Sequence, residues 1–111
     1  MYKNLAATLV AALAFSAAGA APAPAPTTTP TQAAWLYMSP VTEAGWTRQH
    51  DEARKLVEKQ LGSSVKTTFV ADVPEGPDAE RVLRDLARQG NQIIFTTSFG
   101  YMEPALKVAK D

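Results

Sequence analysis

Two short segments of the sequence combine aromatic residues, a glycine and hydroxyl groups, which are residue types that line small-molecule sites. The first segment is Gly45-Trp46-Thr47 and the second is Ser98-Phe99-Gly100-Tyr101. Aromatic rings offer a stacking face, hydroxyls and free backbone N–H groups offer hydrogen bonds, and glycine lets a ligand approach the backbone. A helical pattern follows each segment. We therefore interpret these seven residues as candidate ligand-binding residues.

Structural roles remain open for the same residues. Trp46 could be a packing residue at the start of a helix, and Phe99 and Tyr101 could close the core from above. His50 lies one turn after Trp46, where a hydrogen-bonded structural histidine is favoured over a base or a ligand. Ser98 and His50 could be a nucleophile and its base, but no sequence feature places them in contact. Since phosphate-loop and nucleophile-elbow motifs are also missing, we expect a protein that is not an enzyme.

The composition excludes several classes of site. The 111 residues include no cysteine and a single histidine, which excludes disulfides, thiolate nucleophiles and histidine metal clusters. The 11 basic residues balance the 11 acidic residues, so no basic stripe is available to neutralise phosphates. We therefore expect no metal, no cofactor and no nucleic-acid partner.

Residues 1–20 have the pattern of a secretory signal peptide. Lys3 supplies the positive charge, the apolar run from Leu5 to Ala18 is uncharged, and Ala18-Gly19-Ala20 resembles a cleavage site. The short, alanine-rich run favours cleavage over a membrane anchor, and no cysteine follows it to carry a lipid. We expect a periplasmic product without membrane insertion, in which an Ala/Pro/Thr linker (21–32) precedes one domain (33–111).

The domain shows strand patterns alternating with helix patterns. The first helix is predicted at Trp46–Leu61, with an apolar face formed by Ala53, Leu56, Val57 and Leu61. The remaining predicted elements are strands at Ala33–Met38, Val65–Val70 and Gln92–Thr96, a helix from Asp78 to Gly90, and a last helix that starts near Glu103-Pro104.

This alternation predicts an α/β fold with a parallel sheet. With strand order 2-1-3, a ligand would bind beyond the carboxyl ends of the first and third strands, where the two candidate segments meet. The third strand would be left as an open edge, which we interpret as a lobe truncated after about three βα units.

Three motifs resemble the basic membrane protein (BMP, PnrA-like) family of ABC-transporter substrate-binding proteins. They are Pro40-Val41-Thr42-Glu43-Ala44-Gly45-Trp46-Thr47-Arg48-Gln49-His50-Asp51-Glu52, Val73-Pro74-Glu75-Gly76-Pro77-Asp78-Ala79-Glu80-Arg81-Val82 and Ile94-Phe95-Thr96-Thr97-Ser98-Phe99-Gly100-Tyr101-Met102. Their order and spacing match the family from about Trp35 to the end of the chain. The resemblance implies the flavodoxin-like N-terminal lobe of a type I periplasmic binding protein.

The resemblance also implies a small-molecule ligand, a purine nucleoside or nucleobase, and an ABC permease as partner. An aromatic residue at the place of Trp46 stacks on the base in this family, and the loop matching Ser98–Tyr101 faces the same cleft. The first loop departs from the Asp-x-Ser-Phe-Asn pattern of many nucleoside-binding members, which leaves another aromatic heterocycle open as the ligand. A ligand-sensing protein without a transport partner, or a small exported enzyme, remain alternatives.

Overall fold

The computed structural model describes residue 19, residues 22–23 and residues 28–111. All but one residue of the predicted signal peptide, and part of the predicted linker, lie outside the described residues. The predictions of export and cleavage therefore stay predictions.

Three strands alternate with three α-helices, as the sequence pattern predicts. The bounds of two elements, α1 and β2, are those predicted, whereas β1 lies two residues earlier and the last helix starts at Met102. A 3-10 turn occupies most of the predicted loop between the third strand and that helix. In chain order the elements are β1 (Thr31–Leu36), α1 (Trp46–Leu61), η1 (Gly62–Ser64), β2 (Val65–Val70), α2 (Pro77–Arg88), β3 (Ile93–Thr96), η2 (Phe99–Tyr101) and α3 (Met102–Val108).

The three strands form one parallel sheet in the order β2-β1-β3, which confirms the predicted order. In the register of the sheet, Trp35 lies between Phe69 of β2 and Phe95 of β3. Parallel strands that share this register end at the same edge of the sheet. The loops that follow β1 and β3 are thereby brought together, as the strand order required.

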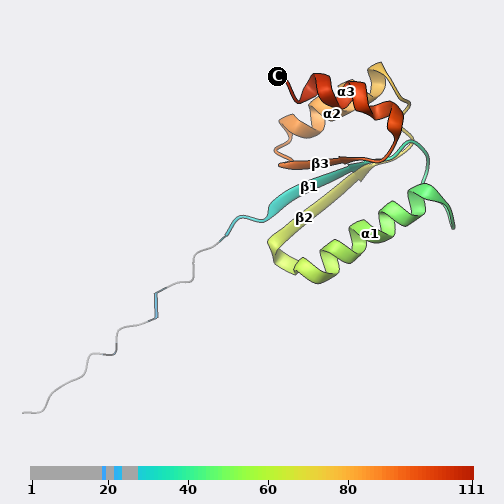
Figure 1. The fold of residues 1–111 in the computed structure, drawn as a ribbon. Coiled ribbons are helices and arrows are strands. Elements are labelled where there is room, and N and C mark those ends of the chain that lie inside the picture. The colour runs from blue at the N-terminus through green and yellow to red at the C-terminus, as the bar shows by residue number, and fades with distance from the viewer. Residues whose placement is uncertain (1–18, 20–21, 24–27) are drawn as a thin grey trace, which may run out of the picture.

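Helices cover both faces of the sheet (Figure 1). On one face, α2 and α3 pack over a core whose largest fully buried side chains include Leu36 and Tyr101. Val73, Ala79 and Leu83 complete this core. Burial of an apolar side chain contributes about 1.5–3 kcal/mol, so this face is stabilised by apolar packing.

On the other face, α1 packs through polar side chains, which corrects one prediction. The buried residues of α1 are Thr47, Asp51 and Arg54, whereas the predicted apolar positions Leu56 and Leu61 are exposed. The guanidinium of Arg54 donates to Asp51 (2.9 Å) and lies over the ring of Phe69. A long side chain whose charge is paired can fill a core position, and an apolar pattern does not reveal this.

Two residues of the predicted apolar face of α1 instead border a hollow over the β1–β3 half of the sheet. Val57 and Leu61 line this hollow on the helix side, and Trp35, Ile93 and Phe95 line it on the sheet side. The Trp35 and Phe95 rings are stacked, with centroids 4.5 Å apart. Within the described residues, this half of the sheet face is therefore only partly covered.

Candidate functional site

The loops after β1 and β3 meet at the carboxyl edge of the sheet. The backbone N–H and the hydroxyl of Thr97 both donate to the carbonyl oxygen of Leu36, at 3.2 and 2.8 Å. The indole Nε1 of Trp46 in turn donates to the carbonyl oxygen of Thr97, at 2.6 Å. One chain of hydrogen bonds therefore joins the end of β1, the end of β3 and the first residue of α1.

Trp46 is held firmly but leaves its ring accessible. Its side chain is 64% exposed although Nε1 is bound to Thr97. The ring of His50, one turn further along α1, packs edge-on against the indole at a centroid distance of 4.8 Å. With its polar atom bound and His50 packed beside it, Trp46 presents an oriented and largely exposed aromatic ring at the carboxyl edge of the sheet.

The residues beside Trp46 shape the start of α1. Gly45 has a φ of 100°, in the region where any other residue is strained. Thr47 is buried, and its hydroxyl shares a hydrogen bond of 2.6 Å with the hydroxyl of Ser39. Thr47 thus attaches the first turn of α1, which begins at Trp46, to the preceding loop.

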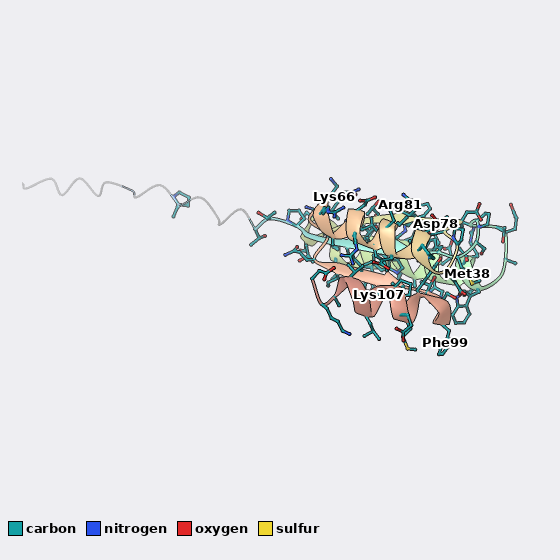
Figure 2. The ribbon with its side chains drawn as sticks, turned by 90° about the horizontal axis from the view of Figure 1, so that it is seen from above. Met38, Lys66, Asp78, Arg81, Phe99 and Lys107 are labelled. Atoms are coloured by element: carbon teal, nitrogen blue, oxygen red, sulfur yellow. The ribbon has the colours of Figure 1, made fainter. Side chains whose placement is uncertain are left out.

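The four residues of the second segment take different positions. Phe99 is 86% exposed and points away from the fold (Figure 2), whereas Ser98 and Gly100 are half-buried. Tyr101 is fully buried, and its hydroxyl donates to the carbonyl oxygen of Val73 at 2.6 Å. The structure thus leaves Ser98 and Phe99 accessible, in the loop whose Thr97 carbonyl contacts Trp46, but places Tyr101 in the core, the alternative left open from the sequence.

The buried hydroxyl of Tyr101 ionises less readily than that of an exposed tyrosine. Burial, followed by the negative charge of Glu75, raises the pKa of Tyr101 to about 12. At neutral pH the hydroxyl is therefore a permanent donor to Val73. This bond ties the loop after β2 to the η2 turn.

Glu75 contacts the second candidate segment, although the residue types and spacing did not single it out. It lies in the loop after β2, and its carboxylate accepts a hydrogen bond from the Ser98 hydroxyl. A β-carbon added at Gly100 would meet the same carboxylate, so the glycine leaves room for it. Little in the sequence indicates that Glu75 and Ser98 meet, because they follow β2 and β3, which lie on opposite sides of β1.

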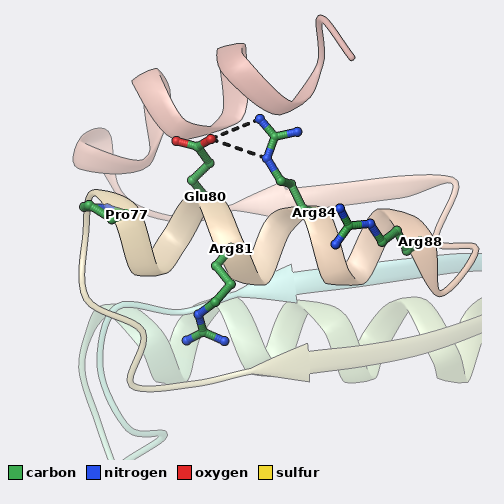
Figure 3. Close-up of a pocket in the computed structure, with 5 residues that line it drawn as sticks. All are labelled: Pro77, Glu80, Arg81, Arg84 and Arg88. Atoms are coloured by element: carbon green, nitrogen blue, oxygen red, sulfur yellow. Dashed lines mark hydrogen bonds and ion pairs between the residues drawn. The ribbon is translucent and has the colours of Figure 1, made fainter.

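The arginines of α2 border a separate hollow, which is lined by Pro77, Glu80, Arg81, Arg84 and Arg88 (Figure 3). Arg84 is paired with Glu80 at 3.0 Å and also with Asp111. Arg88 is paired with Asp85. Paired charges of this kind on an exposed helix surface are typical of a solvated face and contribute little to stability.

Within the described residues, no cluster of His, Asp or Glu side chains has the arrangement of a metal site. No helix of this same part combines the length and the apolar character that a bilayer crossing needs. What the carboxyl edge offers is the exposed ring of Trp46, and in the loops after β2 and β3 the paired side chains of Glu75 and Ser98. An aromatic surface with a few polar groups is the kind of lining that small-molecule sites use.

Comparison with known proteins supports the resemblance seen in the three motifs. A purine-binding protein of Brucella abortus is 53% identical over 79 residues, which is 71% of this chain and 23% of that relative. A Haloferax volcanii protein, named as an ABC transporter glucose-binding protein, is 38% identical over 79 residues, 71% of this chain and 20% of the relative. No protein-family profile matches the chain.

The chain spans about a quarter or less of the length of these curated relatives. Its α/β fold, with a three-stranded parallel sheet, is consistent with the N-terminal lobe of a periplasmic binding protein. These relatives are binding proteins, not enzymes. Over the 79 aligned residues, the chain is homologous to ABC-transporter binding proteins of the BMP family.

Proposed function

We propose that this chain contributes one wall of the ligand site in an extracytoplasmic substrate-binding protein of an ABC importer. The proposed ligand is a purine, as a nucleobase or a nucleoside. The proposed location is the periplasm, reached through the predicted signal peptide at residues 1–20, and the proposed partner is an ABC permease in the inner membrane.

The oriented indole of Trp46 carries this proposal. Its Nε1 is occupied by the Thr97 carbonyl, so the exposed ring is available for stacking without a competing polar demand. An aromatic platform of this kind binds any planar base, with a gain of ~1–3 kcal/mol per stacked base. A sugar ring that lacks a planar face would gain less, and for this reason we favour the purine over the glucose named for the second relative.

Homology supports the same choice. The relative named for purine binding has higher identity to this chain than the relative named for glucose binding, 53% against 38% over the same alignment length. The mechanism that follows is closure of a second lobe over a base stacked on Trp46. The closed form would then dock on the permease.

Intrinsic fluorescence tests this proposal because the two tryptophans differ in environment. Trp46 is 64% exposed at the carboxyl edge, whereas Trp35, in the central strand β1, is 5% exposed. Adenine added to the mature chain should shift the emission of the Trp46 indole and protect it from a soluble quencher. Trp46→Phe should abolish the shift and leave the Trp35 emission unchanged.

Two results would contradict the proposal. One is an emission of Trp46 that no purine changes at millimolar concentration, while the chain is folded by circular dichroism. The other is a shift that persists in Trp46→Phe, because it would place the ligand near Trp35 instead.

A further inference from the structure

The Ser98 hydroxyl has a single proton, and the structure shows where that proton goes. Ser98 Oγ lies within hydrogen-bonding distance of Oε1 of Glu75. An ionised carboxylate only accepts hydrogen bonds, whereas a hydroxyl has one donor and two lone pairs. Ser98 must therefore donate its proton to Glu75, and only its lone pairs remain for another molecule.

The loop that carries Glu75 is anchored by its surroundings, while the side chain itself is exposed. Pro74 and Pro77 flank its loop and fix the backbone φ there. The hydroxyl of Tyr101 holds the carbonyl of Val73, which anchors the same loop to η2. Gly100 provides the space that the carboxylate occupies, since a β-carbon at this position would meet it.

We propose that Glu75 makes Ser98 an obligatory hydrogen-bond acceptor, so that this wall selects a ligand with an N–H donor over a ligand with a carbonyl. This inference rests on the proposed function, because it takes a planar base stacked on Trp46 as the ligand. The class it specifies is a purine with an exocyclic amino group. Glu75 acts through Ser98 and is a positioning residue for specificity.

The geometry supports this assignment of polarity. Ser98 directly follows Thr97, whose carbonyl holds the indole of Trp46. A base that stacks on Trp46 and extends past the Nε1 edge of the indole would reach the residue that follows Thr97. A carbonyl oxygen brought to this edge would face the lone pairs of Ser98 and the charge of Glu75, and neither group could offer it a proton.

Adenine and hypoxanthine are suitable probes because they share the ring system and carry opposite groups at C6, an amino donor in adenine and a carbonyl acceptor in hypoxanthine. Hypoxanthine also has an N–H at N1, so the comparison tests the group at C6. Each is titrated into the isotopically labelled mature chain, and binding is followed by NMR at the Trp46 indole and the amides of Ser98–Gly100. The unmodified chain should bind adenine about threefold to tenfold more tightly than hypoxanthine, the range of one net hydrogen bond.

Two variants should remove this preference by different routes. In Glu75→Gln the side-chain amide can donate to Ser98, which frees the hydroxyl proton for a carbonyl, so the ratio of the two affinities should fall toward one. In Gly100→Ala the new β-carbon displaces the carboxylate, and the cost is small because the displaced group is the end of a flexible side chain. Both variants should give the same ratio, and their combination should change it no further.

Glu103→Gln is the matched control, because it removes the same charge from an exposed residue at the start of α3. It should keep the preference for adenine. Amide spectra confirm that each variant is folded before its ratio is interpreted.

The possible failures are distinguishable. If neither purine perturbs the Trp46 indole, the proposed function is wrong and the inference falls with it. If both purines perturb it with equal affinity in the unmodified chain, or if Glu75→Gln keeps the preference, the platform stands and the role of Glu75 is overturned.

Discussion

Removal of the buried guanidinium of Arg54 should destabilise the fold strongly. Arg54→Met keeps most of the apolar stem and removes the donors to Asp51 and Thr67, both at 2.9 Å, together with the cation over Phe69. Asp51 is 3% exposed and would keep the hydroxyl of Tyr37 and the ammonium of Lys55 as partners.

The magnitude follows from what remains around Asp51. Breaking a buried ion pair costs about 3–5 kcal/mol when the other charge is left unpaired. Because Lys55 still lies 3.1 Å from Asp51, we expect the lower end, ~3 kcal/mol. For a domain of this size, that loss lowers the melting temperature by about 12–24 °C.

Urea unfolding, followed by circular dichroism, measures this loss. Arg81→Met is the control, since Arg81 forms an exposed pair with Asp78 at 3.4 Å and its loss should change the free energy of unfolding by less than about 0.5 kcal/mol. Asp51→Asn combined with Arg54→Met should cost less than the sum of the single changes. Equal losses in Arg54→Met and Arg81→Met would refute the claim that polar contacts hold α1 on the sheet.

Three further predictions concern titration and the aromatic residues. Burial alone would raise the pKa of Asp51, but hydrogen bonds from Lys55 and Arg54 outweigh burial and lower it. The contribution of Asp51 to the free energy of unfolding should therefore be constant above about pH 4 and fall below it. Asp51→Asn should flatten this part of the plot of urea midpoint against pH. Burial, followed by a negative charge nearby, raises the pKa values of Tyr37 and Tyr101 to about 12. Each hydroxyl therefore keeps its proton in the folded chain to a higher pH than in the unfolded chain. The contribution of the two hydroxyls to the free energy of unfolding should be fully present below about pH 10 and decrease above it, together with the rise in tyrosinate absorbance. Tyr101→Phe leaves the Val73 carbonyl without its donor and should cost about 1–3 kcal/mol in urea unfolding; a cost near zero would show that this bond does not anchor the loop after β2.

The order and type of the elements could be predicted from the sequence because they depend on local patterns. Apolar runs of strand length and helical periodicity are present in each segment, and the βαβ connection fixes most of the topology. The same local logic gave the bounds of α1 and β2.

The buried face of α1 could not be predicted, because it combines a charge pair within the helix with contacts to β2 that hydrophobic periodicity does not reveal. Arg54 is buried only because Asp51, Thr67 and Phe69 receive its donors and its charge. Hydrophobic periodicity scores such a residue as exposed, so the prediction selected the neighbouring apolar stripe instead.

The candidate site was predictable at the level of segments but not of single side chains. Trp46 and Phe99 have similar sequence contexts to Tyr101, yet two are exposed and one is fully buried. The difference lies in the Val73 carbonyl, which gives Tyr101 a buried acceptor. Glu75 was missed because it lies in the loop after β2 and its partner Ser98 lies in the loop after β3, and these two strands are not neighbours in the sheet.

The central place of β1 in the sheet has a consequence for the folding kinetics. Both strands that pair with β1 come later in the chain, as Thr31 pairs with Val65 and Ala33 pairs with Ile93. The first strand to be synthesised can therefore form no ladder until a crossover has closed a long loop, and sheets with such non-local pairing fold slowly. During that interval the apolar run of β1 stays unpaired and accessible to other molecules.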